Sequence, residues 1–133
     1  MARILIVDDE PAVLRALRST LERAGHEVTE APEGKTALRH FAGNPTDLVI
    51  SDICMPEMDG IDFLMRVREA FPEARIVAMS GGGHVSRDRV LGAASMLGAV
   101  GILEKPFSQE EALEAVRVAM ETAVDPPGRS LNR

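Results

Sequence analysis

The feature that most constrains this chain is a short apolar run that stops abruptly at two acidic residues. Residues 3–7 read Arg-Ile-Leu-Ile-Val, and Asp8 and Asp9 follow directly. An uninterrupted run of branched aliphatic residues is typical of a strand that is buried on both faces of a parallel sheet. A helix is then expected to begin at Glu10-Pro11, because proline is tolerated in the first helical turn.

The same order, an apolar run followed by a helical pattern, recurs along the chain. Further strands are expected at His26–Ala31, Asp47–Ser51, Arg75–Met79 and Gly101–Glu104. Helices are expected from Pro11 to about Gly25 and over about residues 34–42, 61–70, 85–97 and 109–122. This alternation predicts an α/β fold, in which helices cover both faces of a parallel sheet and the crossovers are right-handed. The first of these later runs is half polar, which indicates a strand at the sheet edge.

The composition narrows the classes of function. With 133 residues, of which 45% are hydrophobic, the chain is typical of one soluble globular domain. A net charge of −6, only 3% aromatic residues and the lack of a basic block argue against direct binding of DNA or RNA. The single cysteine, Cys54, cannot form an internal disulfide, and no apolar run reaches the roughly 18 residues of a membrane span. We therefore expect a cytoplasmic protein that does not associate with a membrane.

Charged and polar residues stand where the expected strands end, namely Asp8, Asp9, Asp52, Ser80 and Lys105. Ligands of open parallel sheets bind outside the carboxyl ends of the strands, so these side chains are expected in one crevice. Two carboxylates about 4 Å apart repel each other by roughly 4 kcal/mol at an effective dielectric constant of 20. A hard divalent cation such as Mg²⁺ would offset this repulsion, because it prefers oxygen ligands, and Lys105 would add a fixed positive charge.

A crevice of this kind is complementary to a phosphoryl group. An aspartate carboxylate can attack phosphorus and form an acyl phosphate. The transition state of phosphoryl transfer spreads negative charge over three equatorial oxygens. The metal, the ammonium of Lys105 and the hydroxyl of Ser80 would supply one stabilising group for each of them. The residues therefore predict that Asp52 accepts a phosphoryl group.

These motifs resemble those of the receiver domain of bacterial two-component response regulators. The matching segments follow one another along nearly the whole chain: Asp8-Asp9, Asp52-Ile53-Cys54-Met55-Pro56, Asp59-Gly60, Ser80-Gly81, Gly98-Ala99 and Lys105-Pro106-Phe107. The resemblance implies a flavodoxin-like, doubly wound sheet of five parallel strands in the order 2-1-3-4-5, with five helices. It implies a receiver domain over residues 1–122. Residues 123–133, rich in proline, glycine and polar residues, are expected to be a disordered tail or the stub of a linker.

The resemblance also implies a metal site beside the phosphoacceptor. Asp52 would receive its phosphoryl group from a histidine kinase or a histidine phosphotransfer protein. Asp9 would bind Mg²⁺ or Mn²⁺ directly, and Asp8 would assist through a water molecule. Asp52 and the backbone carbonyl of Cys54 would complete the ligands from the protein.

Two further residues would bind the phosphoryl group itself. By the same resemblance, Ser80 would hydrogen-bond a phosphoryl oxygen, and Lys105 would form an ion pair with it. The peptide bond between Lys105 and Pro106 is expected to be cis. The protein would then be a stoichiometric phosphoacceptor and not an enzyme, with metal-dependent self-phosphorylation and slow self-dephosphorylation as its only chemistry.

Phosphorylation is expected to act as a switch. It adds about −1.5 to −2 charges at Asp52, and Ser80 and Lys105 can follow that charge. The response is expected on the face built from the fourth helix, the fifth strand and the fifth helix, where a downstream protein or a second phosphorylated copy would bind. Receivers usually carry an aromatic switch residue three positions before the lysine, where this chain has Ile102. The loop 81–84 also departs from the usual pattern, because it is longer than is common.

Two other classes of function stay open at this point. A metal-dependent phosphohydrolase with an aspartate nucleophile usually carries a second aspartate two residues later, where this chain has Cys54. A structural or dimerisation module that does not need phosphorylation would agree with Ile102. The aspartates could also be simple helix caps, Lys105 a solvated surface lysine and Ser80 an ordinary turn residue. The complete set at matching spacing favours the phosphoacceptor.

Overall fold

The first strand and the helix that follows it form where the sequence predicts them. The computed structural model describes residues 1–53, 60–81 and 87–122. β1 spans Arg3–Val7, and α1 spans Pro11–Arg23, with the proline in the first turn. The other elements are β2 (Glu27–Ala31), α2 (Gly34–Gly43), β3 (Leu48–Asp52), α3 (Gly60–Ala70), β4 (Arg75–Gly81), α4 (Arg87–Leu97), β5 (Gly101–Lys105) and α5 (Gln109–Glu121).

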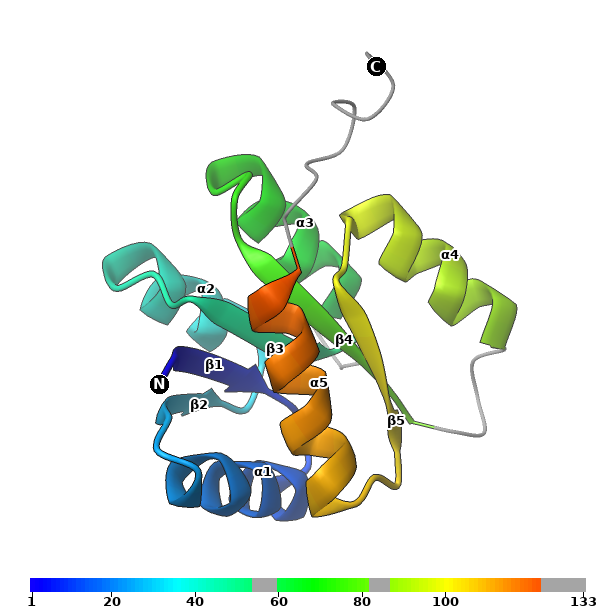
Figure 1. Ribbon diagram of the computed structural model, residues 1–133. Coiled ribbons are helices and arrows are strands. Elements are labelled where there is room, and N and C mark those ends of the chain that lie inside the picture. The colour runs from blue at the N-terminus through cyan, green and yellow to red at the C-terminus, as the bar shows by residue number, and fades with distance from the viewer. Residues whose placement is uncertain (54–59, 82–86, 123–133) are drawn as a thin grey trace.

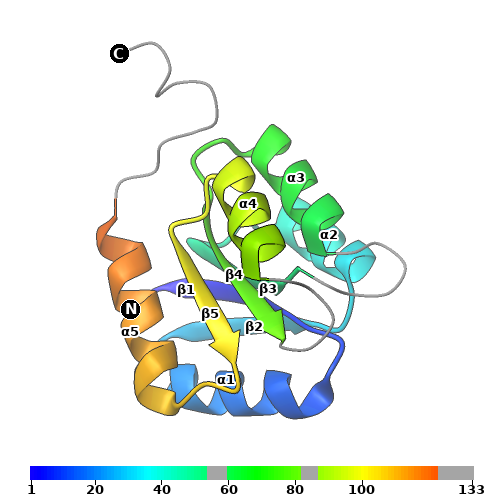
Figure 2. The same cartoon turned by 90° about the vertical axis from the view of Figure 1, so that its right-hand side faces the viewer.

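The five strands form one parallel sheet in the order β2-β1-β3-β4-β5 (Figure 1). The predicted flavodoxin-like order is therefore confirmed, and the half-polar strand β2 lies at an edge as expected. Helices α1 and α5 cover one face of the sheet, while α2, α3 and α4 cover the other (Figures 1 and 2). Among the described residues, no helix is long and apolar enough to cross a bilayer.

Each face of the sheet has its own hydrophobic core, because successive strand residues point to opposite faces. In β1, Ile4 and Ile6 pack with the residues of α1 and α5, whereas Leu5 and Val7 pack with those of α2, α3 and α4. All residues of β3 are buried, including Asp52 at its end. The central strands are thus held from both sides, which fixes the position of the carboxyl edge of the sheet.

Strands β4 and β5 extend slightly beyond their predicted ends. Ser80 pairs with Glu104 in the register of the sheet, and Gly81 pairs with Lys105. The sequence placed the ends at Met79 and Glu104, because the residues become polar or glycine there. That prediction is wrong by one or two residues, since backbone pairing between the two strands continues past the last apolar side chain.

The start of α5 is fixed by its side chains. The Ser108 hydroxyl accepts a hydrogen bond from the Glu111 backbone N–H, and the Glu111 carboxylate accepts one from the Ser108 N–H, at 3.0 Å and 2.8 Å. This reciprocal capping box holds the chain directly after the peptide bond between Lys105 and Pro106, which is cis as predicted. The expected tail, residues 123–133, lies outside the described part of the chain.

Candidate functional site

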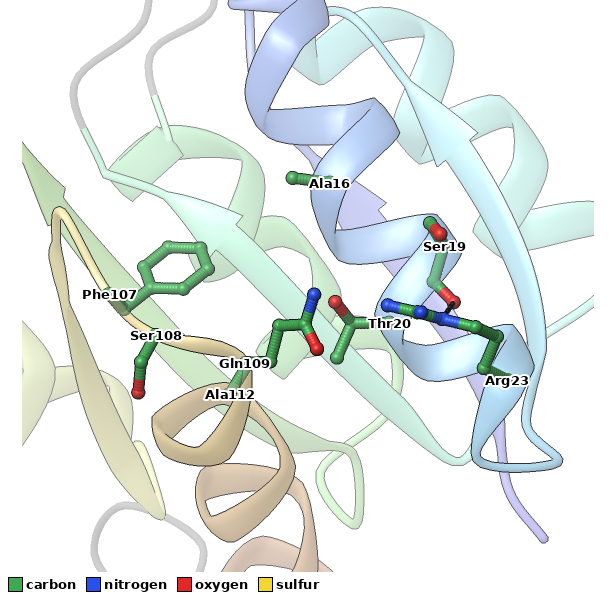
Figure 3. Close-up of a pocket in the computed structure, with 8 residues that line it drawn as sticks. All are labelled: Ala16, Ser19, Thr20, Arg23, Phe107, Ser108, Gln109 and Ala112. Atoms are coloured by element: carbon green, nitrogen blue, oxygen red, sulfur yellow. Dashed lines mark hydrogen bonds between the residues drawn. The ribbon is translucent and has the colours of Figure 1, made fainter.

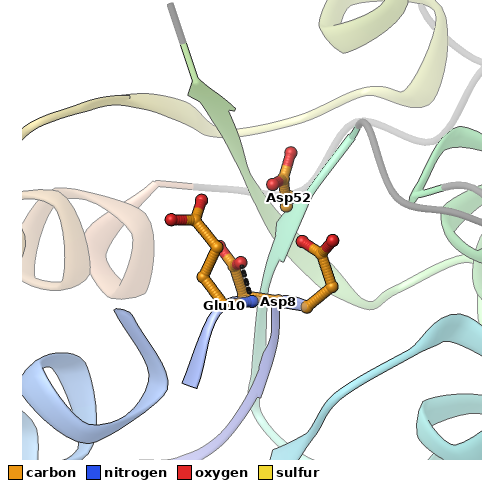
Figure 4. A group of neighbouring side chains, drawn as sticks. Asp8, Glu10 and Asp52 are labelled. Carbon is orange, nitrogen blue, oxygen red and sulfur yellow. Dashed lines mark hydrogen bonds between the residues drawn. The ribbon is translucent and has the colours of Figure 1, made fainter. Parts of the chain in front are cut away.

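Acidic side chains gather at the carboxyl edge of the sheet. Asp8 follows β1, Asp52 ends β3 and Glu10 precedes α1, and their carboxylates lie close together (Figure 4). Asp9 belongs to the same group, in which one carboxylate oxygen from each of the four residues lies within 4.8 Å of the others. The structure thus brings together the three aspartates that the sequence predicted.

The backbone around these aspartates is tied to neighbouring strands. The Asp8 N–H donates to the Ala31 carbonyl at the end of β2, and the Ile53 N–H donates to the Met79 carbonyl of β4, both at 3.2 Å. Asp8 is 0% exposed and Asp52 is 5% exposed, whereas Asp9 lies at the surface. Two of the acids are therefore held in the body of the protein, and the third faces solvent.

Lys105 points into this acidic group from the end of β5. Its Nζ atom lies 2.6 Å from Asp8 Oδ2, 2.9 Å from Asp52 Oδ2 and 3.1 Å from Glu10 Oε1. Burial on its own would lower the pKa of Lys105, but the hydrogen bonds and charges of Asp8 and Asp52 raise it above the usual value. Lys105 is thus a fixed cation, and the reading of it as a solvated surface lysine is wrong.

The arrangement at Asp8 fits a divalent cation. Burial raises the pKa of Asp8, although hydrogen bonds with Lys105 and with the Glu10 backbone N–H oppose that rise. Asp8 Oδ2 is buried and forms an ion pair with Lys105 Nζ at 2.6 Å. The donors nearby are all carboxylate oxygens, which Mg²⁺ and Mn²⁺ prefer. Asp8, Asp9 and Asp52 could therefore hold such an ion.

The other predicted site residues are distributed as follows. Ser80 is half-buried in β4, the strand that lies between those of Asp52 and Lys105. Ile102 is half-buried and packs against the core under α2, α3 and α4. Cys54, with the metal-binding carbonyl predicted for it, lies outside the described residues, as do residues 82–84 of the glycine-rich loop.

Glu10 is a site residue that the sequence reasoning missed. It was read only as the residue that opens α1, yet its carboxylate reaches Lys105 and joins the acidic group. Although Glu10 stands at the start of α1, its side chain makes no capping hydrogen bond there. The available signal was its place in an unbroken acidic run directly after a buried strand.

Gly60 helps to position the site because it has no side chain. A Cβ atom at this position would collide with the Asp52 carbonyl oxygen and would lie 2.5 Å from Ile53 Cα. The first residue of α3 therefore packs directly against the backbone that carries Asp52. The sequence showed Asp59-Gly60 only as a motif, without this reason for it.

A second hollow, of about 130 Å³, lies between α1 and the start of α5 (Figure 3). Its lining contains no carboxylate and includes Arg23, Phe107 and Gln109. It is separate from the acidic group, because none of the four acids lines it. This hollow therefore offers none of the carboxylates that the predicted phosphoryl chemistry needs.

Comparison with protein families identifies one model that matches most of the chain. Residues 4–117 match the response regulator receiver domain. Among curated proteins, the transcriptional regulatory protein KdpE of Mycobacterium tuberculosis is 39% identical over 90% of this chain and 51% of its own length. The DNA-binding transcriptional regulator NtrC of Azospirillum brasilense is 33% identical over 94% of this chain and 25% of its own length. The chain thus spans about half of the length of the first relative and a quarter of the length of the second.

Solved structures with the same fold include two of similar length. A response regulator receiver domain protein from Clostridium thermocellum is 31% identical, with a TM-score of 0.82, over 91% of this chain and 95% of the other. The chemotaxis protein CheY4 of Vibrio cholerae is 32% identical, with a TM-score of 0.80, over 88% of this chain and 97% of the other. Both similarities extend over nearly the whole of each partner chain.

Proposed function

Because this chain belongs to the response regulator receiver domain family, we propose that Asp52 accepts a phosphoryl group and thereby switches interactions with other proteins. The observation that carries this proposal is the contact of Lys105 with both Asp8 and Asp52 at the carboxyl edge of the sheet. A buried acid, a fixed cation and further carboxylates that fit a divalent metal make a site suited to phosphoryl transfer. The donor would be a histidine kinase or a histidine phosphotransfer protein.

In the proposed reaction, an oxygen of the Asp52 carboxylate attacks the phosphorus of the donor. The new O–P bond forms as the P–N bond to the donor histidine breaks, and the departing imidazole takes up a proton. A Mg²⁺ or Mn²⁺ ion held by Asp8, Asp9, Asp52 and the Cys54 carbonyl would supply positive charge to the transferring oxygens. Lys105 would exchange its Asp52 contact for one with a phosphoryl oxygen, and Ser80 would donate a hydrogen bond to another.

The proposed chemistry is stoichiometric. Slow loss of the phosphoryl group to water would be the only turnover, because the position two residues after Asp52 is Cys54 and offers no carboxylic acid for sustained hydrolysis. This feature favours a phosphoacceptor over a phosphohydrolase. The burial of Lys105 among the acids favours it over a structural module that does not need phosphorylation.

The proposed output face is formed by α4, β5 and α5. A groove of about 580 Å³ runs between β5 and α5 on this face, with apolar side chains such as Ile102 and Val118 and the acidic side chains Glu104, Glu110 and Glu114. A downstream protein would bind there, or a second phosphorylated copy would. The net charge of −6 argues against direct contact with nucleic acid, and we place the protein in the cytoplasm.

Labelling with acetyl phosphate tests the proposal. In the presence of Mg²⁺, the protein should gain one phosphoryl group per chain, measured by intact mass, and Asp52→Asn should gain none. Glu69→Gln, an exposed acid on α3, is the matched control and should be labelled like the unmodified protein. Labelling of Asp52→Asn would place the acceptor elsewhere, and continued release of phosphate beyond one equivalent at a catalytic rate would indicate an enzyme.

A further inference from the structure

Arg68 of α3 is a buried cation that joins two segments of backbone. It is 7% exposed and donates hydrogen bonds to four carbonyl oxygens. Its Nη1 atom lies 2.7 Å from both the Pro72 and the Ala74 oxygens, in the connection between α3 and β4. Its Nε and Nη2 atoms lie 2.9 Å and 3.3 Å from the Leu97 and Gly98 oxygens, at the end of α4.

The end of α4 needs these contacts because backbone hydrogen bonds within the helix satisfy only some of the carbonyl groups in its last turn. Gly98 has a φ of 67°, its N–H donates to the Ser95 carbonyl at 3.1 Å, and the Ala99 N–H donates to the Ala94 carbonyl at 2.9 Å. This is the Schellman arrangement that ends many helices. The carbonyls of Leu97 and Gly98 accept from Arg68, whose positive charge also lies at the negative end of the helix dipole.

Arginine suits this position because its planar group presents donors in a fixed fork. Burial lowers the pKa of Arg68, although the charge of Glu73 opposes that effect, and a guanidinium still keeps its proton in a protein. A residue without the fork would leave some of these four carbonyl oxygens without a donor, which destabilises the backbone that carries them. Arg68 therefore ties the connection between α3 and β4 to the C-terminal end of α4.

The rest of α4 is held less firmly. Its buried side chains are those of Val90, Ala93, Ala94 and Leu97, and the two alanines bury little apolar surface. Leu97, the most buried of the four, is at the C-terminal end beside Arg68. The contacts that hold α4 are therefore strongest at its C-terminal end, which lies away from Asp52.

We propose that Arg68 pins the C-terminal end of α4 in both states of the switch, so that phosphorylation at Asp52 rearranges the helix from its N-terminal side only. This inference rests on the proposed phosphorylation of Asp52. Arg68 is then a positioning residue, which acts on the output face through α4 and does not touch the reacting atoms. It determines which end of α4 carries the signal.

Amide-resolved hydrogen exchange by NMR tests this role in the full chain, with Mg²⁺ and with or without beryllofluoride, a mimic of the phosphoryl group. In the unmodified protein, beryllofluoride should change the exchange of the amides of residues 90–94 and leave those of Gly98 and Ala99 unchanged. In Arg68→Met, the Gly98 and Ala99 amides should exchange about tenfold faster or more in both states, because the end of the helix opens locally.

Two further variants sharpen the test. Arg68→Lys keeps the charge without the fork and should give an exchange rate at Gly98 between those of the unmodified protein and Arg68→Met. If Arg68→Met does not fold, Arg68→Lys provides the test instead. Arg66→Met removes an exposed arginine of the same helix, one that pairs with Asp62 at 3.6 Å, and should leave Gly98 unchanged. All variants except those that fail to fold should keep the affinity for beryllofluoride within about twofold, since Arg68 lies far from Asp52 in the fold.

The outcomes separate this inference from the proposed function. Suppose that, in the unmodified protein, beryllofluoride shifts the Asp52 signal and changes amide exchange equally at both ends of α4. That result would refute the role of Arg68 but leave the proposed function intact. Unchanged exchange of Gly98 in Arg68→Met would also refute it. No Mg²⁺-dependent shift at Asp52 with beryllofluoride would refute the proposed function, and the switching role of Arg68 with it.

Discussion

At the scale of single residues, the ammonium of Lys105 is shared among three carboxylates. Asp8 and Asp52 are buried partners, whereas Glu10 is an exposed one at 3.1 Å. A phosphoryl group on Asp52 would have to draw Lys105 away from part of this set. In the proposed phosphorylated state, Glu10 would therefore compete with the phosphoryl group for Lys105.

Glu10→Gln should strengthen the binding of beryllofluoride at saturating Mg²⁺. An exposed ion pair contributes about 0.2–1 kcal/mol, so the affinity should rise up to about fivefold. The change is measured by titration of NMR shifts or by calorimetry. Glu110→Gln, an exposed acid on α5, serves as the control and should have no effect. Weaker binding in Glu10→Gln would show instead that Glu10 helps to hold the metal.

His26 provides a pH dependence of stability. Its Nδ1 atom accepts a hydrogen bond from the Ala2 backbone N–H at 3.0 Å, and burial, with the nearby amino terminus, lowers its pKa. A histidine with a lowered pKa in the folded state stabilises the fold above its unfolded pKa. That contribution is lost as the pH falls through the folded value. The free energy of unfolding should therefore decrease between pH 7.5 and pH 5.5.

His26→Asn keeps an acceptor near the position of Nδ1 but does not titrate. Over the same pH range it should lose less stability than the unmodified protein, with a difference of about 1 kcal/mol or less, the net value of one hydrogen bond. Urea titrations at the two pH values measure it. Parallel pH profiles of the two proteins would exclude His26 as the cause.

Site residues can be predicted from the sequence where they stand at the end of a strand. They cannot be predicted where a long side chain contacts segments that are distant in sequence. Asp8, Asp52 and Lys105 could be predicted because each stands at the end of an apolar run. Glu10 and Arg68 could not, because periodicity does not show where a long, flexible side chain ends. Their roles depend on tertiary contacts with segments distant in sequence.

At the scale of secondary structure, the close approach of α3 to β3 fixes the direction of the end of β3, the strand that carries Asp52. Gly60 allows the first turn of α3 to lie against the backbone of Asp52 and Ile53. The colliding atoms would be backbone atoms, which cannot rotate away as a side chain can. Any larger residue must displace either the helix or the strand end.

Gly60→Ala should destabilise the fold by about 1–3 kcal/mol and weaken the binding of beryllofluoride, because the end of β3 must shift. Urea unfolding and NMR titration measure the two effects. Gly92→Ala is the matched control within α4, where an added Cβ meets no atom within 4 Å, and it should be neutral or slightly stabilising. Full stability in Gly60→Ala would show that the backbone yields at little cost.

Secondary structure is predicted well where apolar patterning and pairing coincide. β1 matches its predicted bounds, because the residues after it are charged and leave the sheet. β4 extends to Gly81, because pairing with β5 continues after the side chains have become polar or absent. The backbone can satisfy its hydrogen bonds there without apolar residues, so composition alone does not locate the end.

At the scale of the whole molecule, we expect the crowded acids at the carboxyl edge to make the stability of the fold depend on cations. Asp9→Asn should raise the melting temperature without Mg²⁺ by roughly 3–6 °C, because it removes about 1 kcal/mol of repulsion from an exposed member of the group. It should also reduce the stabilisation that Mg²⁺ gives by binding the folded state. Thermal unfolding in EDTA and in Mg²⁺ measures both effects.

Glu69→Gln changes the net charge equally at a distance from the acidic group and serves as the control for that prediction. Its melting temperature should follow that of the unmodified protein in both buffers. An equal rise in both variants would attribute the effect to overall charge. A lower melting temperature for Asp9→Asn in EDTA would contradict crowding of the acids.

The two cores on either side of the sheet also limit which changes in chain length this architecture can accept. In β3, Leu48 and Ile50 pack in the core under α1 and α5, whereas Val49 packs in the core under α2, α3 and α4. Asp52 is the last residue of the same strand. A single residue inserted between Leu48 and Asp52 would reverse the direction of the side chains on one side of the insertion, so that either the apolar residues would face the wrong layer or the Asp52 carboxylate would turn toward the opposite helices. Lineages of this fold should therefore vary in length between the strands while keeping an unbroken residue count within this one.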